Sequence, residues 1–241
     1  MNLTTELPST ADLVVVGGGV LGAATAFYAS RAGLRVVVVE RRPLLATLTT
    51  AVAAGGFRAQ FDNPEETALV MESIAAFQNF AELAGLPGYD LRLRTPGYLF
   101  VTTCPANARR QAEQVALQRA WGIDDVELLD GDEARYRFPF LSEEVSSARF
   151  RAADGFLDPK RLTYGFARAS AAPFVVSTAV TGFSLAGGRI AGVRTERGDI
   201  STGAVVVAAG PFSGPVARRA GLNRSVTTVR RQKRTIVDVP E

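Results

Sequence analysis

The chain has 241 residues, of which 47% are apolar, so it can bury the core of one large domain or of two interleaved smaller ones. Its 27 basic and 24 acidic residues leave a net charge of only +3, which disfavours a dedicated nucleic-acid-binding face. The single cysteine permits no internal disulfide and predicts a cytoplasmic setting, while the lack of histidine excludes histidine metal ligands and histidine-activated nucleophiles, so that difficult chemistry needs a bound cofactor.

Residues 12–40 have the pattern of a βαβ unit. Asp12 and the apolar residues 13–16 predict a buried parallel strand, 20–32 predicts a helix that ends at Gly33, and 35–39 predicts a second strand. The order strand, helix, strand within one short segment is typical of the first half of a dinucleotide-binding fold.

Three glycines, Gly17, Gly19 and Gly22, follow the first strand with the spacing Gly-x-Gly-x-x-Gly. The first permits a tight turn, the second lets the backbone approach a pyrophosphate, and the third lets the helix pack closely on the strand. The first helical turn, which includes Val20 and Leu21, then points its free N–H groups at phosphate. This context predicts a bound dinucleotide and not merely a glycine-rich turn.

The uncharged run 13–30 is also long enough to raise the question of a membrane span. Glu6 and Asp12 precede it where a signal peptide has basic residues, and the glycines at 17–19 interrupt it. We therefore expect no membrane span here.

Glu40 ends the second strand, 18 residues after Gly22, where it can accept hydrogen bonds from ribose hydroxyls. A carboxylate at this place disfavours NADP because it repels the 2′-phosphate. Arg41 and Arg42 follow, and we interpret them as a solvated edge or as cover for the adenine. The chain then leaves on a long excursion instead of continuing with another helix and strand, which favours FAD over NAD.

The excursion, residues 43–61, lacks helical periodicity and is rich in small residues. The hydroxyls of Thr49 and Thr50 could contact the pyrophosphate, and Gly55 and Gly56 could let a flavin ring approach. A plain surface loop is the alternative.

Asn63 and Pro64 predict the start of a helix that runs to Gly85. We interpret its apolar stripe, Val70, Ile74, Phe77, Ala81 and Ala84, as core. The next expected elements are strands within 91–103 broken at Pro96-Gly97, a helix over 105–121, and turns at 138–140 and 154–156.

The α/β pattern then resumes. The expected elements are a helix over 159–170, strands at 174–176 and 179–183, a β-meander through 189–200, a buried central strand at 204–210, a short helix at 213–220 and a long strand at 226–239. Ala209 and Gly210 end the central strand with nothing bulky, so a ligand can cross the sheet edge there.

Five stretches together resemble the D-amino-acid-oxidase-like FAD oxidoreductases, especially the branch of the sarcosine oxidase β-subunit and amino-acid dehydrogenases. They are 16–22, 55–61, 97–100, 154–159 and 205–211. The resemblance implies that Gly17, Gly19, Gly22 and Glu40 hold the ADP half of FAD, that Thr49 and Thr50 lie along the pyrophosphate, that Gly55, Gly56 and Arg58 lie near the flavin ring, and that Val180 contacts adenine through its backbone.

The resemblance also implies the chemistry: a small amine or amino acid gives hydride to flavin N5, and the imine is released and hydrolysed. The segment before Gly55 departs from the family's usual Gly-Ser-Gly-like run, which puts some phosphate contacts in doubt. Family members usually continue for well over a hundred residues, so we expect the isolated chain to bind FAD weakly, and to self-associate or need a partner subunit for turnover.

We therefore predict an α/β fold: a FAD-binding Rossmann-type parallel sheet with a β-meander, plus an interleaved, incomplete α+β substrate domain. The expected FAD-binding domain is 1–60 and 149–222, and the expected substrate domain is 61–148 and 223–241. The predicted function is oxidation of the C–N bond of a sarcosine-, glycine- or proline-like substrate. The alternatives are a non-catalytic FAD-binding fragment or subunit and, further off, a flavin hydroxylase.

Overall fold

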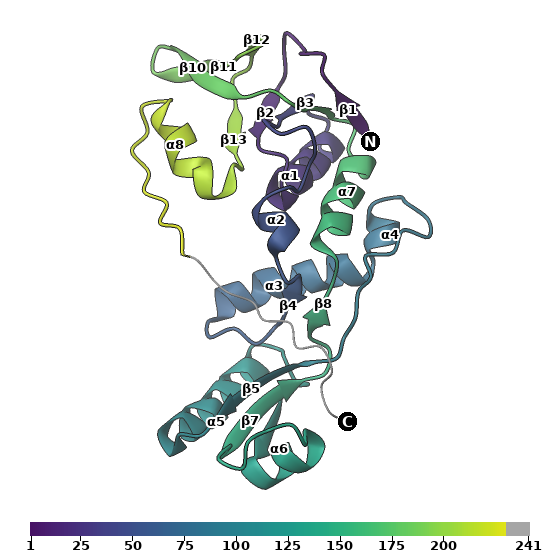
Figure 1. Cartoon of the computed structure of the whole chain (residues 1–241), viewed down its shortest axis with the longest axis vertical. Helices are drawn as coiled ribbons and strands as arrows, with labels where there is room; N and C mark the ends of the chain where they lie inside the picture. The colour runs from purple at the N-terminus through teal and green to yellow at the C-terminus, as the bar shows by residue number, and fades with distance from the viewer. Residues whose placement is uncertain (230–241) are drawn as a thin grey trace. The chain divides into compact units, whose positions relative to one another are not determined.

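A computed structural model describes residues 1–229, which form two compact units (Figure 1). The first unit comprises residues 1–54, 81–91 and 158–229, and the second comprises 55–80 and 92–157. These units begin and end elsewhere than the expected domains: 55–60 and 149–157 lie in the second unit, whereas 81–91 and 223–229 lie in the first. Pairing between short strands at 56–57 and 155–156 explains why these two segments stay together.

A parallel sheet with the strand order β1-β9-β3-β2-β13 forms the base of the first unit. Its strands are β1 (Asn2–Thr4), β2 (Leu13–Val16), β3 (Val36–Val39), β9 (Pro173–Val175) and β13 (Val205–Val207). Val16 is in register with Val39 on one side and with Val207 on the other. The carboxyl ends of β2, β3 and β13 therefore meet at one edge of the sheet, where ligands bind in open parallel sheets.

Both faces of this sheet are covered. On one face, α1 (Val20–Arg31) packs against α7 (Pro159–Ala169), with the rings of Phe27 and Phe166 5.3 Å apart. On the other face lies the antiparallel meander of β10 (Val180–Ala186), β11 (Arg189–Thr195) and β12 (Gly198–Ser201).

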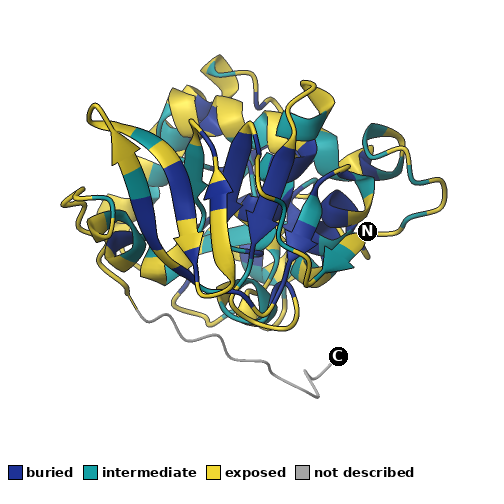
Figure 2. Ribbon diagram, turned by 90° about the horizontal axis from the view of Figure 1, so that it is seen from above, coloured by how far each residue is buried: buried dark blue, intermediate teal, exposed yellow. Residues whose placement is uncertain are grey.

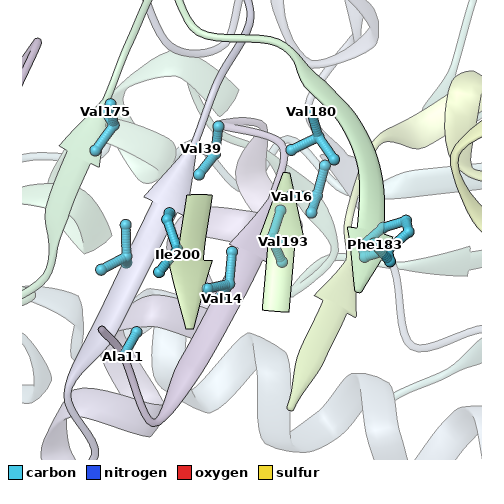
Figure 3. Close-up of a cluster of buried hydrophobic side chains, with 10 residues drawn as sticks. Ala11, Val14, Val16, Val39, Val175, Val180, Phe183, Val193 and Ile200 are labelled. Atoms are coloured by element: carbon cyan, nitrogen blue, oxygen red, sulfur yellow. The ribbon is translucent and has the colours of Figure 1, made fainter. Parts of the chain in front are cut away.

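The core between sheet and meander explains the valine-rich strands. Val14 and Val16 of β2 lie in one apolar cluster with Phe183, Val193 and Ile200 of the meander (Figure 3). The alternate residue of β2, Val15, is fully buried as well. β2 and β3 are buried along their whole length, as the dark blue strands of Figure 2 show. Strands buried on both faces consist of continuous apolar runs, which is why 13–16 and 36–39 lack alternation.

The strand expected at 204–210 differs from the prediction. β13 covers only Val205–Val207, and all three residues are half-buried. Among the described residues β13 is the edge of the sheet, because it pairs only with β2. An edge position leaves one side of the strand without a neighbour, so the expectation of a buried central strand is wrong for the described chain.

The second unit contains an antiparallel sheet with the order β5-β7-β6 and a separate two-stranded ladder, β4-β8. Its elements are β4 (Gly56–Phe57), α3 (Pro64–Gln78), β5 (Tyr98–Thr102), α5 (Pro105–Ala120), β6 (Glu127–Asp130), α6 (Gly131–Arg137), β7 (Ser147–Arg151) and β8 (Gly155–Phe156). Leu129, Ala148 and Phe150 are among the buried residues of its apolar core.

The predicted start of α3 is confirmed, because the Asn63 side chain accepts a hydrogen bond from the Glu66 N–H at 2.8 Å. Its predicted end at Gly85 is wrong. Both the backbone N–H and the side-chain amide of Asn79 bond the Ala75 carbonyl, at 3.1 and 3.0 Å. This local competition for the carbonyl ends the helix at Gln78, and a separate short helix, α4 (Phe80–Leu83), follows.

Two other expectations need correction. Residues 91–97 form no strand beyond one bridge at Arg94, because Arg92 takes a positive φ of 53° that breaks an extended run. The segment 154–156, expected as a turn, contains strand β8, and the excursion 43–61 contains the short helix α2 (Thr49–Val52) and strand β4.

The described chain ends with a 3₁₀ turn at Gly210–Phe212 and the helix α8 (Ser213–Arg218), close to the helix expected at 213–220. Residues 226–229 form no strand, and the rest of the strand expected at 226–239 lies outside the described residues. Within residues 1–229, none of the helices has the length and apolarity that crossing a bilayer requires.

Candidate functional site

A pocket of about 330 Å³ opens in the first unit at the carboxyl edge of the parallel sheet. The residues around it come from the ends of β2, β3 and β13, the start of α1, the segment 46–50, the start of β10, and the turn and helix at 210–219. They are Val16, Gly17, Gly19, Val20, Leu21, Val39, Glu40, Arg41, Ala46, Thr47, Leu48, Thr49, Thr50, Thr178, Ala179, Val180, Ala208, Ala209, Gly210, Pro211, Phe212, Pro215, Val216 and Arg219. The pocket size is at the lower end of small-molecule sites.

The glycine turn before α1 is packed too tightly for side chains at two places. Gly17 has a φ of +117°, and a Cβ there would lie 2.5 Å from the carbonyl oxygen of Ala208. A Cβ at Gly22 would lie only 1.9 Å from the carbonyl oxygen of Gly17. Gly22 therefore does not line the pocket but lets α1 begin directly against the turn, as the motif predicts.

The N-terminus of α1 faces the pocket with hydrogen-bond donors. The Thr50 hydroxyl accepts a hydrogen bond from the Val20 N–H at 3.2 Å. The N–H groups of Gly19 and Leu21 have no acceptor among the residues that the structure describes. Free N–H groups and the positive end of the helix dipole together favour a bound anion such as phosphate.

Glu40, at the end of β3, also lines the pocket. One carboxylate oxygen accepts a hydrogen bond from the Gly18 N–H at 2.7 Å, and the other accepts one from the Arg42 N–H at 2.8 Å. Each carboxylate oxygen has a further lone pair, so both can still accept from a ligand hydroxyl. Glu40 thus ties the glycine turn to the end of β3 while presenting negative charge to the pocket.

The far end of the pocket is more apolar. The guanidinium of Arg41 lies 4.1 Å from the centre of the Phe212 ring, and Arg219 donates a hydrogen bond to the Val180 carbonyl. Val216 adds apolar surface from α8. This partly apolar and aromatic lining suits a nucleobase.

The structure brings most of the predicted cofactor-binding residues to this one pocket: Gly17, Gly19, Val20, Leu21, Glu40, Arg41, Thr49, Thr50, Val180, Ala209 and Gly210. Sequence reasoning missed Thr178, Phe212 and Arg219. Phe212 follows the small residues 208–210 after β13, and these were the available sequence signal. Thr178 and Arg219 are placed only by the tertiary fold.

Gly55, Gly56 and Arg58, predicted near the flavin ring, lie in the second unit. The Arg58 guanidinium lies 4.6 Å from the centre of the Phe61 ring, 5.5 Å from that of Tyr98 and 5.6 Å from that of Phe100. Its Nε is buried without an acceptor, and no carboxylate of the described residues pairs with it.

A second arginine, Arg149, contacts one of the same rings: its guanidinium lies 4.6 Å from the centre of the Phe100 ring. Burial lowers the pKa of Arg149 and the charge of Arg58 lowers it further, whereas the charges of Asp62 and Asp154 raise it. Its closest carboxylate, on the exposed Asp62, is 3.8 Å away.

Replacing Thr50 by valine tests the phosphate end of the pocket. The change keeps the side-chain volume and removes the hydroxyl, which accepts from the Val20 N–H and can donate its own proton to a phosphate, so we expect FAD affinity to fall by roughly five- to tenfold, the effect of one hydrogen bond. Titration of flavin fluorescence measures it. Thr5→Val, at an exposed residue outside the pocket, is the matched control, and equal affinities of the two variants would remove Thr50 from the site.

A family model for FAD dependent oxidoreductases matches residues 12–241. The chain belongs to this family. FAD is its cofactor, as it is for the family as a whole. The first unit fits FAD: the turn has no room for a Cβ at Gly22, the start of α1 presents free N–H groups, and Glu40 faces the pocket.

Several curated proteins are similar to the chain. FAD-dependent oxidoreductase domain-containing protein 1 of Xenopus laevis is 33% identical over 67% of the chain and 34% of its own length. Human mitochondrial sarcosine dehydrogenase is 28% identical over 90% of the chain and 24% of its own length. Glycine oxidase of Bacillus licheniformis is 26% identical over 88% of the chain and 58% of its own length. The chain thus spans about a third of the first relative.

Solved structures give the same assignment. L-proline dehydrogenase from P. horikoshii has a TM-score of 0.83 and 27% identity, over 92% of this chain and 58% of that one. Glycine oxidase from Bacillus cereus has a TM-score of 0.73 and 26% identity, over 87% of this chain and 58% of that one. The predicted fold class, an α/β fold with a FAD-binding parallel sheet, is confirmed.

Proposed function

We propose that this FAD-dependent oxidoreductase oxidises the C–N bond of a small amino acid or N-methylated amino acid. Its relatives include proteins named for sarcosine, glycine and L-proline. These three compounds share one chemical plan, in which a carboxylate is attached to the carbon next to the amine. A substrate of this class needs a cationic group to hold the carboxylate and an electron acceptor near the C–H bond.

The observation that carries the proposal is the unpaired guanidinium of Arg58. Its aromatic neighbours contact it through their ring faces, and its buried Nε has no hydrogen-bond partner among the described residues. An unpaired buried donor costs free energy, which a bound carboxylate can recover through charge-assisted hydrogen bonds. We assign Arg58 the task of binding and orienting the substrate carboxylate. FAD, when bound, supplies the acceptor for the electron pair of the C–H bond.

A substrate panel tests the class. Flavin bound to the purified protein should be bleached without oxygen by sarcosine, glycine or proline, and not by NADH or NADPH. Bleaching by NADH or NADPH alone would instead indicate a flavin hydroxylase or reductase. Bound FAD that none of these compounds bleaches would favour a non-catalytic FAD-binding subunit that needs a partner.

Arg58→Met should raise the KM for the amino acid by about 10- to 100-fold, because one or two charge-assisted hydrogen bonds are lost. FAD affinity should stay within about twofold of the wild-type value, since Arg58 is not among the residues that line the nucleotide pocket. Arg110→Met, at an exposed arginine of α5, is the matched control. Equal KM values for the two variants would contradict the assignment of Arg58.

A further inference from the structure

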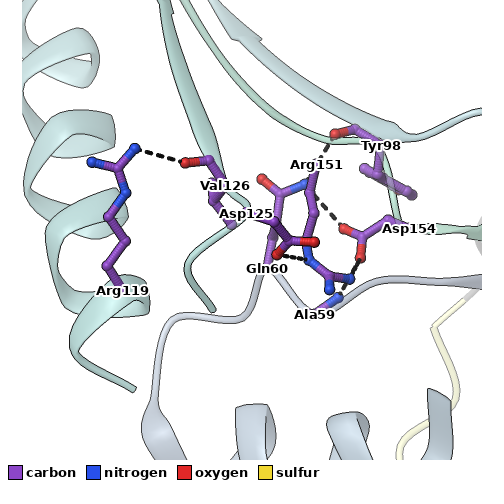
Figure 4. Close-up of polar contacts among 8 residues, drawn as sticks. All are labelled: Ala59, Gln60, Tyr98, Arg119, Asp125, Val126, Arg151 and Asp154. Atoms are coloured by element: carbon purple, nitrogen blue, oxygen red, sulfur yellow. Dashed lines mark hydrogen bonds and ion pairs between the residues drawn. The ribbon is translucent and has the colours of Figure 1, made fainter. Parts of the chain in front are cut away.

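The carboxylate of Asp154 is the most completely enclosed charged group of the second unit, with none of its surface exposed. One oxygen accepts hydrogen bonds from the Ala59 N–H at 2.9 Å and from the Arg151 Nη1 at 2.7 Å, and the other accepts from the Gln60 amide at 3.1 Å (Figure 4). A buried carboxylate needs such partners to offset its loss of hydration. Two of the three donors belong to the residues directly after Arg58.

Residues 155–157 form backbone hydrogen bonds with the residues that precede Arg58. Gly56 pairs with Phe156, Phe57 pairs with Gly155, and the Leu157 N–H bonds the Gly55 carbonyl at 3.0 Å. The backbone is therefore fixed at 55–57 by the ladder and at 59 by Asp154. Arg58 lies between these two fixed points.

Gly155 allows the strand 155–156 to lie between the backbone at 56–57 and the backbone at Arg94. A Cβ on Gly155 would be 1.9 Å from the Arg94 carbonyl oxygen, because Arg94 and Phe156 exchange backbone hydrogen bonds of 2.8 and 2.9 Å on that side. The two residues of the Asp-Gly pair thus have separate structural roles. Asp154 accepts hydrogen bonds from the residues after Arg58, and Gly155 leaves room for the backbone of Arg94.

Gln60 connects the same carboxylate to the aromatic surroundings of Arg58. Its amide nitrogen donates both to Asp154 and to the Tyr98 carbonyl, the latter at 2.9 Å. Tyr98 is one of the rings beside the Arg58 guanidinium. The position of the ring and the position of the arginine backbone are therefore set through one side chain.

From these contacts we infer that Asp154, acting through Ala59 and Gln60, is a positioning residue that fixes the Arg58 guanidinium for the carboxylate of the substrate. This inference rests on the proposed function of Arg58. Asp154 itself touches neither substrate nor cofactor in this assignment. Its contribution is to keep Arg58 in one orientation before the ligand arrives, so that less conformational entropy is lost on binding.

The competing explanation is that Asp154 only neutralises Arg151. The structure offers a control for it, because Arg151 has a second carboxylate: its Nε lies 2.6 Å from Asp125, which is half-exposed and makes no contact with Ala59 or Gln60 (Figure 4). Asp154→Asn and Asp125→Asn each remove one negative charge from the same arginine. Only the first changes the partner of residues 59 and 60.

The decisive measurement is solvent exchange of the Arg58 Nε–H in protein labelled with ¹⁵N-arginine, with the resonance assigned by Arg58→Lys. We expect exchange to rise by about tenfold or more in Asp154→Asn, and to change by less than about twofold in Asp125→Asn. Gln60→Met, which keeps the carboxylate and removes its amide partner, should raise exchange by a smaller factor. It keeps the inference testable if Asp154→Asn does not fold.

Titration of each variant with acetate separates the two proposals. Weaker acetate binding in Asp154→Asn, together with faster exchange, supports the positioning role. Equal exchange in Asp154→Asn and wild type, with Gln60→Met also unchanged, overturns it. If acetate fails to bind even the wild type while exchange differs as expected, the carboxylate function of Arg58 is wrong, and the control of its orientation by Asp154 stands.

Discussion

Replacing Gly22 by alanine is expected to abolish FAD binding. A Cβ at this position would lie 1.9 Å from the Gly17 carbonyl oxygen and 3.5 Å from a Val15 methyl group, so α1 has to move away from the turn and from β2. The obstacle is backbone, which cannot rotate away as a flexible side chain can. The movement displaces the N–H groups at the start of α1, and with them the phosphate site.

Affinity for FAD should fall by about a hundredfold or more, because overpacking of this kind costs about 1–3 kcal/mol and the phosphate contacts are lost in addition. The flavin absorbance retained on purification and a fluorescence titration measure the loss. Gly203→Ala is the matched control, since a Cβ there meets nothing within 4 Å and Gly203 is exposed. Wild-type affinity in Gly22→Ala would show that this turn does not hold the cofactor.

The nucleotide half of the fold could be predicted because its signals are local. The valine runs at 13–16 and 36–39 are buried on both faces, and Gly22 lies against the carbonyl oxygen of Gly17 in the same turn. The charge at Glu40 follows from the end of the same strand. The residues needed for these predictions all lie within one βαβ unit, so no knowledge of distant contacts was required.

The parts that could not be predicted depend on distant contacts. Strands β4 and β8 have two residues each and exist because they pair with each other across almost a hundred positions of sequence. No periodicity can show in two residues. The pocket residue Arg219 is likewise placed by its hydrogen bond to Val180, which follows from tertiary packing and not from any pattern around position 219.

The break of α3 at Asn79 illustrates a third case, in which a local signal was present but weaker than its surroundings. The apolar stripe continues past this residue to Ala84, and it favours one long helix. Asn79 instead bonds the Ala75 carbonyl with its own side chain. Of the stripe interpreted as core, only Ile74 is buried and the other four residues are half-buried, so the hydrophobic period overestimated both the burial and the length of this helix.

Replacing Glu40 by alanine is expected to weaken FAD binding by about 1–3 kcal/mol, because charge-assisted hydrogen bonds to the ribose hydroxyls are lost. The same change releases the N–H groups of Gly18 and Arg42, which the carboxylate holds at 2.7 and 2.8 Å. The effect on binding therefore has two sources, the lost ligand contact and the loosened glycine turn.

Two measurements separate these sources. The thermal unfolding midpoint of the FAD-free protein reports the lost backbone contacts alone, whereas the change in FAD affinity reports both. Glu6→Ala, at an exposed acid of the same unit, controls for the change in net charge. If Glu40→Ala lowers the unfolding midpoint and leaves FAD affinity unchanged, Glu40 only ties the turn to β3. If the free energy of FAD binding falls by more than the free energy of unfolding of the FAD-free protein, the Glu40 carboxylate contacts the ribose.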